Sequence, residues 1–209
     1  MYKQILKQAY NNHAHERDRL ELEGWKIKER EVFLERLKAE NCNRILEIGA
    51  GPGRDSLYFQ QSGLQVTCID LSEEMVKRCM EKGLDAYCMD LCELDFPPES
   101  FDAVYALNCL LHVPKSQLTE VLDRILQVLR EDGMFFCGVY GGQDTEGIWE
   151  DDSYEPKRFF AMYEDDVLLG IMAKKFQVVD FHTVNVGERA QHFQSFTLRR
   201  KKKIIKAIP

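Results

Sequence analysis

Three glycines, Gly49, Gly51 and Gly53, alternate with other residues immediately after the short apolar segment 44–48. The apolar segment predicts a buried strand, and an amphipathic segment begins at Arg54 after the glycines. Glycine adopts positive φ without strain and lets a ligand approach the bare backbone. A strand, a glycine-rich turn and the start of a helix form the ligand-binding end of a nucleotide-type α/β unit. The spacing therefore predicts a site for a nucleotide-like ligand.

A carboxylate follows the next expected strand. Segment 65–69 reads as that strand and ends at Asp70. An acid about 20 residues beyond such glycines can accept hydrogen bonds from a ribose diol. The dinucleotide fingerprint would need its third glycine where Arg54 stands, which disfavours a NAD-type oxidoreductase. A P-loop is also excluded, because the Gly-Lys-Ser/Thr ending is missing.

The pattern Glu47-x-Gly49-x-Gly51-x-Gly53 resembles motif I of the class I S-adenosylmethionine (SAM) methyltransferases. The resemblance covers about residues 40–140 and extends to the segment Pro98–Val104, which is similar to the usual start of the fourth strand in that family. It implies one doubly wound α/β sheet of seven strands, mostly parallel with one antiparallel strand, and SAM as cofactor. The cofactor-binding residues it implies are Glu47, Gly49, Ala50, Gly51, Gly53, Asp70, Leu71, Met75, Asp90, Leu91, Leu107 and Asn108.

Within this resemblance, Asp90 lies beside the adenine amino group, and Leu71, with Met75, packs on the adenine ring. An ordinary buried Leu and Met would show the same pattern. The loop 107–114 follows the fourth strand and borders both the methionine part of SAM and the methyl acceptor. The acceptor side is expected to involve aromatic and polar residues from several segments: Tyr10, Trp25, His112, Tyr140, Trp149, Arg158, Phe159 and His192.

Methyl transfer from a sulfonium is a direct displacement, so the protein mainly aligns the reactants and excludes water. A general base is needed only where the acceptor carries a proton of high pKa. His112 is the candidate base, because it stands next to the acceptor side and histidine titrates near neutrality. A hydrogen-bonded structural histidine is the competing interpretation. For Tyr10 and Trp25 the competing interpretation is core packing, and for Arg158 it is an exposed salt bridge.

The residues after the fourth strand also bear on the acceptor. Enzymes that methylate exocyclic amines of bases resemble one another in an Asn/Asp-Pro-Pro-aromatic motif, whereas this chain has Asn108-Cys109-Leu110-Leu111. No Pro-Cys pair supplies the nucleophile of a cytosine-5 enzyme. The prediction is a small-molecule acceptor. A protein or RNA methyltransferase and a SAM-binding protein without catalysis remain alternatives.

The composition of the chain narrows the range of possible partners and compartments. The 209 residues carry a net charge of −7 and a pI near 5.3, which disfavours nucleic acid as a partner. The basic block 199–203 is interpreted as a solvated strand end and tail. No apolar segment is long enough to span a membrane and no signal peptide is visible, so the cytoplasm is expected. No sequence feature indicates an oligomeric state.

Seven cysteines, an odd number, agree with a reducing compartment. Cys88 and Cys92 flank Asp90, but no second pair or nearby histidine completes a zinc site, so no metal is expected.

The elements that must position these residues fit a single domain over 1–209. Residues 1–40 are expected to form a helical cap, with a weak helix in 1–12 that breaks over 11–19, and a stronger helix in 25–39. Residues 41–140 form the SAM-binding core, in which Ser72 and Ser116 cap helices. Residues 141–175 form a lid insertion that opens with a mobile loop, 141–154. Residues 176–209 form a strand pair, turning at 187–189, and a basic tail.

Overall fold

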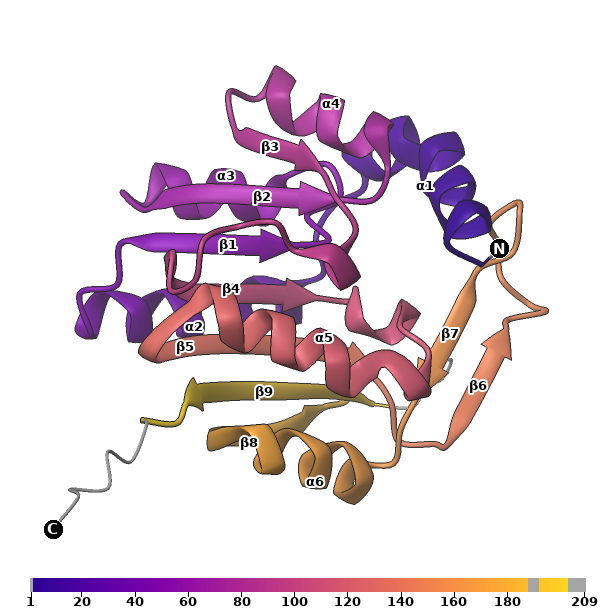
Figure 1. Cartoon of the computed structure of the whole chain (residues 1–209). Coiled ribbons are helices and arrows are strands. Elements are labelled where there is room, and N and C mark those ends of the chain that lie inside the picture. The colour runs from indigo at the N-terminus through magenta and orange to yellow at the C-terminus, as the bar shows by residue number, and fades with distance from the viewer. Residues whose placement is uncertain (1, 188–191, 203–209) are drawn as a thin grey trace, which may run out of the picture.

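The structure, a computed structural model, describes residues 2–187 and 192–202. A seven-stranded sheet is its centre, with strand order β3-β2-β1-β4-β5-β9-β8 (Figure 1). Only β9 runs antiparallel to its neighbours. The predicted fold class, a mostly parallel sheet with one reversed strand, is confirmed. The strands are β1 (Arg44–Ile48), β2 (Gln65–Asp70), β3 (Asp85–Cys88), β4 (Phe101–Leu107), β5 (Leu129–Tyr140), β8 (Phe176–Val184) and β9 (Phe193–Arg200).

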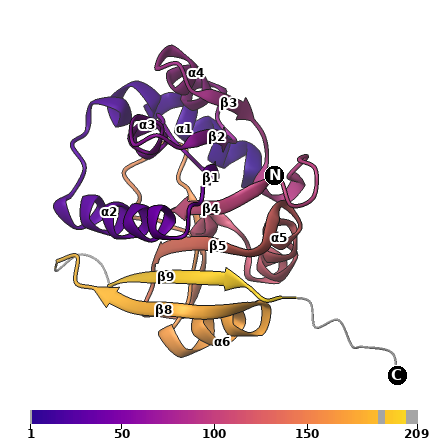
Figure 2. The ribbon, with the colours of Figure 1, turned by 90° about the vertical axis from the view of Figure 1, so that its left-hand side faces the viewer.

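Helices cover both faces of the sheet, and Figure 2 shows α2 and α3 on one side with α5 and α6 on the other. Alternate residues of β4 supply the two faces, because side chains alternate along a strand. Ala103 and Tyr105 pack with α2 and α3, whereas Val104 and Ala106 pack with α5 and α6. The helices are α1 (Tyr2–Arg19), α2 (Gly24–Ala39), α3 (Arg54–Gln61), α4 (Glu73–Glu81), α5 (Lys115–Val128) and α6 (Asp165–Lys175), with short 3₁₀ turns η1 (Leu91–Glu93) and η2 (Leu110–His112).

The N-terminal segment differs from the prediction. The polar residues 11–19 do not break the first helix, because α1 runs without interruption from Tyr2 to Arg19. Its polar side chains find partners across the molecule: Asn11 binds Ser72 and Glu73, and Asn12 donates to the carbonyl of Glu155 at 2.9 Å. Tertiary contacts therefore stabilise a segment whose own amphipathic pattern is weak.

Two further expectations need correction. The segment 141–154 is not loop throughout, since β6 (Thr145–Ile148) pairs antiparallel with β7 (Phe159–Met162) in a separate two-stranded sheet. Ser116 does not cap α5, which begins at Lys115 after Pro114 as N-cap. Proline suits the start of a helix because its missing N–H would be unpaired there in any case.

Other local predictions agree with the structure. The Ser72 hydroxyl accepts a hydrogen bond from the Met75 N–H at 3.2 Å and so caps α4 as predicted. Of the expected turn 187–189, residues 188 and 189 lie outside the described residues, as do 203–209 of the basic tail.

His182 links α2 to the antiparallel end of the sheet and gives a pH-dependent contribution to stability. Its Nδ1 lies 2.8 Å from Asp180 and its Nε2 lies 3.0 Å from Glu29, which is buried. Burial alone would lower the pKa of His182, but the hydrogen bonds to Glu29 and Asp180 outweigh it and raise the pKa. Because the pKa of His182 is higher in the folded protein than in the unfolded chain, its stabilising contribution is present below about pH 6.5, the usual pKa of histidine. The contribution is lost as the pH rises through the pKa of the folded protein.

We therefore expect His182→Gln to lower the melting temperature at pH 6 more than at pH 9. Thermal unfolding of both proteins across this range measures the difference. His15→Gln is the control, because His15 lies on the exposed side of α1. A gap between wild type and His182→Gln that stays constant with pH would contradict the expectation.

Candidate functional site

A cleft of about 730 Å³, part of it open to solvent, lies at the carboxyl ends of β1, β2 and β4. Figure 1 shows α1 and the β6–β7 hairpin at this same end of the sheet. In open α/β sheets, ligands bind at this edge. The lining residues come mainly from α1 and from the loops that follow the strands: Tyr2, Lys3, Leu6, Tyr10, Arg17, Gly49, Gly51, Ile69, Asp70, Leu71, Met89, Asp90, Leu91, Cys92, Leu107, Asn108, Cys109, His112 and Val113.

The glycine turn brings bare backbone to the cleft. Gly49 and Gly53 have φ of +69° and +80°, and a Cβ on either would collide with a neighbouring side chain, that of Cys109 or Leu84. Gly51 differs, because its φ is +55° but a Cβ there would meet no protein atom within 4 Å. Gly53 thus serves packing and Gly49 lines the cleft while packing against Cys109, whereas Gly51 borders space that a ligand can fill.

Asp70 stands at the end of β2, beside this turn. Its two carboxylate oxygens accept one hydrogen bond each, from the N–H of Gly51 at 2.8 Å and of Ser72 at 2.9 Å. Burial raises the pKa of Asp70, although the two backbone hydrogen bonds oppose this effect. A carboxylate has about four lone-pair sites, so Asp70 retains capacity to accept two more hydrogen bonds.

Asp90 follows β3, the strand next to β2, and anchors α1. The ammonium of Lys3 is 2.6 Å from its carboxylate, which also accepts a hydrogen bond from the Cys92 N–H at 2.8 Å. Burial alone would raise the pKa of Asp90, but these two hydrogen bonds outweigh it and lower the pKa. Asp90 therefore carries its negative charge in the cleft at neutral pH.

The remaining residues expected at the cofactor divide into two groups. Leu71, Leu91, Leu107 and Asn108 line the cleft, and the buried Oδ1 of Asn108 has no hydrogen-bond partner in the described part of the chain. The second group does not line it: Glu47, Ala50, Gly53 and Met75.

Glu47 lies in β1, directly before the glycine turn, and supports it. Its buried carboxylate accepts a hydrogen bond from the Ser56 hydroxyl, and burial raises the pKa of Glu47 well above its usual value. Arg54, the first residue of α3, donates to the carbonyl of Leu20 and does not line the cleft. It therefore acts on the α1–α2 connection.

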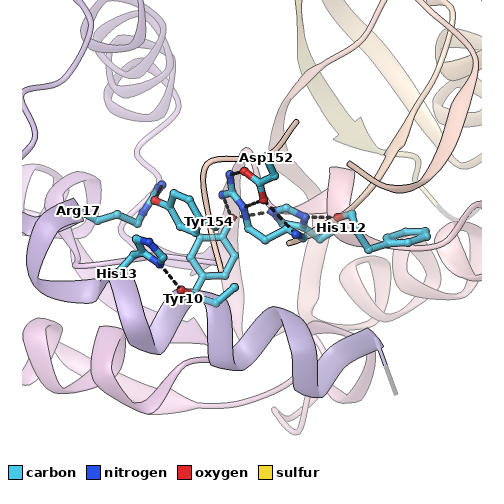
Figure 3. A network of polar contacts seen from close by, with 9 residues as sticks. Tyr10, His13, Arg17, His112, Asp152 and Tyr154 are labelled. Atoms are coloured by element: carbon cyan, nitrogen blue, oxygen red, sulfur yellow. Dashed lines mark hydrogen bonds and ion pairs between the residues drawn. The ribbon is translucent and has the colours of Figure 1, made fainter. Parts of the chain in front are cut away.

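His112 has both ring nitrogens engaged (Figure 3). Its Nδ1 lies 2.7 Å from the Phe159 carbonyl, which can only accept, so Nδ1 carries the proton and donates. Its Nε2 must then accept from the Tyr10 hydroxyl, also at 2.7 Å. Burial lowers the pKa of His112 to about 3, so the ring is neutral. His112 therefore has no free imidazole nitrogen, and both His112 and Tyr10 line the cleft.

Arg158 reaches the same hydroxyl from the hairpin side. Its Nη1 donates to Tyr10 at 3.1 Å, and its guanidinium makes a two-pronged contact with Asp152 at 2.8 and 2.7 Å. The side chains of Arg158 and Asp152 are only 13% and 5% exposed, so this is a buried ion pair and not the exposed salt bridge considered above. Arg158 also stacks over the Tyr154 ring at 3.6 Å.

The segment between β6 and β7 is tied to α1. Arg17 donates to the Tyr154 hydroxyl at 3.0 Å, and the rings of His13 and Tyr154 stack with centroids 4.0 Å apart (Figure 3). Near the start of α1, the rings of Tyr2 and Phe159 lie 5.4 Å apart. Helix α1 and the hairpin therefore contact each other at several points beside the cleft.

Six predicted acceptor-side residues lie outside the cleft lining, and two of them, Arg158 and Phe159, still contact Tyr10 or His112. Trp25 packs against Tyr140 and Phe193, which fits the core-packing interpretation of Trp25. Trp149 packs on Phe160, and His192 lies 2.6 Å from the carboxylate of Asp165. The structure therefore brings Tyr10, His112, Arg158 and Phe159 together, places Trp149 beside them through its backbone hydrogen bond to Arg158, and leaves Trp25, Tyr140 and His192 apart.

Sequence reasoning missed Lys3, Arg17 and Asp152. The sequence contains a pattern that indicates Lys3 and Arg17. Together with Tyr10 they are spaced by seven residues and so share one face of a continuous helix. The expected break over 11–19 concealed it. Asp152 has no such pattern. Within residues 2–187 and 192–202, no group of three or more His, Cys, Asp or Glu side chains is arranged to hold a metal ion.

Comparison with known proteins identifies the central segment. Residues 45–133 match a family model described as a methyltransferase domain. A phosphatidylethanolamine N-methyltransferase of Cereibacter sphaeroides is 39% identical over 98 residues, 43% of this chain and 47% of that protein. A sterol 24-C-methyltransferase of Gibberella zeae is 32% identical over 126 residues, 55% of this chain and 31% of that protein. The chain thus spans less than half the length of these two relatives.

Solved structures share the fold over most of the chain. A 1,6-didemethyltoxoflavin-N1-methyltransferase of Burkholderia thailandensis, with 1,6-didemethyltoxoflavin and S-adenosylhomocysteine bound, has a TM-score of 0.73 at 23% identity, over 96% of this chain and 89% of that one. The N-methyltransferase NodS of Bradyrhizobium japonicum, in complex with S-adenosylhomocysteine, has a TM-score of 0.67 at 14% identity, over 95% of this chain and 100% of that one. These structures and the order of the sheet show the class I S-adenosylmethionine-dependent methyltransferase fold, and the domain match identifies residues 45–133 as a methyltransferase domain.

Proposed function

We propose that the protein transfers a methyl group from SAM to a small-molecule acceptor in the cleft beneath α1. The observation that carries the proposal is the open space beside Gly51 at positive φ, flanked by the carboxylates of Asp70 and Asp90. Residues 41–140 hold the donor, and residues 1–40 with 141–175 cover the acceptor.

The residues present fit SAM. Asp70 has lone pairs left for the two ribose hydroxyls, and Asp90 can accept from the adenine amino group. Leu71 and Leu91 offer apolar surface to the base. Bound SAM supplies an electrophilic methyl group on a sulfonium, so no nucleophilic side chain is required.

On the acceptor side, His112 fixes the direction of the Tyr10 hydroxyl. Tyr10 donates a hydrogen bond to His112 and accepts one from Arg158, so the second lone pair of its oxygen can accept a hydrogen bond from an N–H or O–H of the acceptor. Such a bond orients the nucleophile toward the methyl group, and burial under α1 and the hairpin excludes water. In this proposal Tyr10 touches the acceptor, and His112, the predicted base, positions Tyr10.

A covered cleft favours a small acceptor over a folded protein or RNA. The matched relatives point the same way, since their names specify sterol, phosphatidylethanolamine and a toxoflavin precursor as substrates. No described helix is long and apolar enough to cross a membrane. All seven cysteines are free, which supports the cytoplasm as the proposed compartment.

Calorimetry with S-adenosylhomocysteine (SAH), the product of SAM, and with NAD tests the donor. We expect SAH to bind and NAD not to bind. A metabolite screen for SAH release from SAM then identifies the acceptor. Binding of NAD in place of SAH would overturn the proposal, and SAH binding without turnover on any metabolite would leave a SAM-binding protein in its place.

Tyr10→Phe is expected to slow turnover of the acceptor found by that screen by roughly tenfold to hundredfold, the equivalent of about 1.5–3 kcal/mol. The variant removes the hydroxyl that orients the acceptor but keeps the ring. SAH affinity is expected to stay within about threefold of wild type, a shift of less than about 1 kcal/mol. Tyr87→Phe is the matched control, because Tyr87 is exposed on β3. Unchanged kcat and KM in Tyr10→Phe would remove Tyr10 from the acceptor site.

A further inference from the structure

The described residues that line the cleft include no side chain that is free to remove a proton from a methyl acceptor. A hydroxyl acceptor needs such a base, because a neutral alcohol is a weak nucleophile whose proton must leave as the methyl group arrives. Within the described part of the chain, the lining holds two carboxylates, one imidazole, one lysine, two tyrosines and two cysteines. Their contacts decide which acceptor atoms can be methylated.

Both carboxylates of the lining are engaged. Asp90 pairs with the ammonium of Lys3 at 2.6 Å, so neither group is free to take a proton. Asp70 accepts two backbone hydrogen bonds, and the charge of Arg17 acts on it as well. The remaining lone pairs of Asp70 are those proposed for the ribose hydroxyls. No carboxylate is therefore left for the acceptor.

The thiols of the lining and the hydroxyl of Tyr2 keep their protons at neutral pH. Burial raises the pKa of Tyr2, raises that of Cys92 to about 11, and raises that of Cys109 well above its usual value. The Tyr2 hydroxyl also donates to Oε1 of Gln117 at 3.2 Å. A thiol or phenol that retains its proton is not a base.

The imidazole of the lining is that of His112, and both of its nitrogens are committed (Figure 3). A proton relay through Tyr10 would put a second proton on this buried ring. The charges that act on the ring are those of Arg17 from α1 and of Arg158 and Asp152 from the segment between β6 and β7. Burial, reinforced by the two arginines, lowers the pKa of His112 to about 3, so the ring is too weak a base for such a relay.

We propose that the methyl acceptor is a neutral primary or secondary amine. The assignment rests on the proposed function, because it takes the cleft as the site of methyl transfer. An amine nitrogen carries an available lone pair without first losing a proton. Its N–H can donate to the one lone pair of the Tyr10 oxygen that the contacts with His112 and Arg158 leave free.

Methylation of such a nitrogen is balanced without a base. The nitrogen lone pair forms the bond to the methyl carbon, and the C–S bond breaks with its electrons left on sulfur. The positive charge passes from the sulfonium to the methylated nitrogen, which becomes an ammonium. An alkylammonium has a pKa of about 10 and is stable at neutral pH, so any proton leaves to solvent only after release of the product.

Tyr10 disfavours the charged forms in which an acceptor could enter. A phenolate or alkoxide has no proton to donate, and the Tyr10 proton is committed to His112, so two oxygens would face each other with lone pairs only. An ammonium has no lone pair for the methyl carbon. It would also meet the like charges of Arg17 and Arg158, whose guanidinium carbons lie 5.4 and 5.3 Å from the centroid of the Tyr10 ring. A neutral N–H with an available lone pair avoids all of these conflicts.

SAM labelled with ¹³C in its methyl group tests the assignment in the metabolite screen for SAH release. Heteronuclear NMR of the product separates methyl groups on nitrogen, oxygen, sulfur and carbon by chemical shift. We expect the label on a nitrogen that carried at least one hydrogen. Label on oxygen, sulfur or carbon overturns the assignment and leaves methyl transfer in place. SAH binding without any labelled product overturns the proposed function, and the assignment with it.

His112→Gln and the pH profile of kcat/KM separate a base from a positioning group. Glutamine keeps an oxygen that can accept from the Tyr10 hydroxyl, but it does not titrate. We expect a loss of up to about tenfold, because the hydroxyl is held less well, whereas loss of a general base costs about 10²–10⁴-fold. In wild type and variant, kcat/KM is expected to rise to a plateau with its midpoint at the pKa of the free amine, which NMR titration of the amine alone gives. His15→Gln is the control, because His15 is exposed on α1.

A shifted midpoint together with a loss of a hundredfold or more in folded His112→Gln identifies His112 as a base and overturns the assignment. Circular dichroism shows whether the variant is folded. Tyr10→Phe provides a second test, because a relay to His112 needs the Tyr10 hydroxyl. Its midpoint is expected to match that of wild type, and a midpoint that moves in Tyr10→Phe overturns the assignment as well.

Discussion

Gly51→Val is expected to abolish SAH binding, with a loss of at least about a hundredfold in affinity, or about 2.7 kcal/mol. The valine side chain fills the space beside the turn in which no protein atom lies within 4 Å. A β-branched residue also resists the φ of +55° that the turn requires. The backbone strain costs about 1–3 kcal/mol of folding stability, which is a separate effect from the loss of binding.

Gly83→Val separates the two effects. Gly83 has a φ of +77° and, like Gly51, no protein atom near the position of its Cβ, but it lies in the turn between α4 and β3 and does not line the cleft. Both variants are expected to lower the melting temperature by similar amounts, and only Gly51→Val to lose SAH. Equal SAH affinity in the two folded variants would mean that the ligand does not approach the backbone at Gly51.

Asp70→Ala is expected to weaken SAH binding roughly tenfold to hundredfold, because a charged hydrogen bond contributes about 1.5–3 kcal/mol. The substitution removes the acceptor proposed for the ribose hydroxyls. It also leaves the N–H groups of Gly51 and Ser72 without a partner, so the turn loses its support. Calorimetry measures the affinity, and circular dichroism shows whether the variant is folded.

Asp85→Ala is the control for Asp70→Ala. Asp85 begins β3, at the other end of the strands, and accepts a hydrogen bond from Thr67 at 3.0 Å on the exposed edge of the sheet. Its loss is expected to leave SAH affinity unchanged. SAH binding to folded Asp70→Ala at wild-type strength would place the ribose elsewhere in the cleft.

Local patterns in the sequence were sufficient to predict that Gly51 and Asp70 meet at one edge of the sheet. Gly51 and Asp70 each stand directly after a strand, and the carboxyl ends of parallel strands meet at one edge. Their proximity therefore follows from the order of strands and turns, and the structure joins them by the 2.8 Å hydrogen bond from Gly51 to Asp70. The fold class was predictable for the same reason, because apolar segments, glycine turns and helix caps are all local signals.

The contacts among the residues proposed for the acceptor side were predictable only in part. Tyr10, His112, Arg158 and Phe159 were proposed one by one from position and composition. Nothing in the sequence indicated that Tyr10 donates to a histidine 102 positions away. Trp25 and Trp149 are residue types equally suited to contact an acceptor, yet they pack outside the cleft lining.

The physical reason lies in the range over which each signal acts. Helical periodicity and turn chemistry depend on residues within a few positions, so the sequence alone determined the strand–turn–helix unit and its acids. The continuity of α1, the Tyr10–His112–Phe159 chain and the contact of Arg17 with Tyr154 depend on how α1 packs against the hairpin, which is far from it in the sequence. Only the tertiary structure decided those contacts, because burial selects which polar groups must pair and which one is left to a ligand.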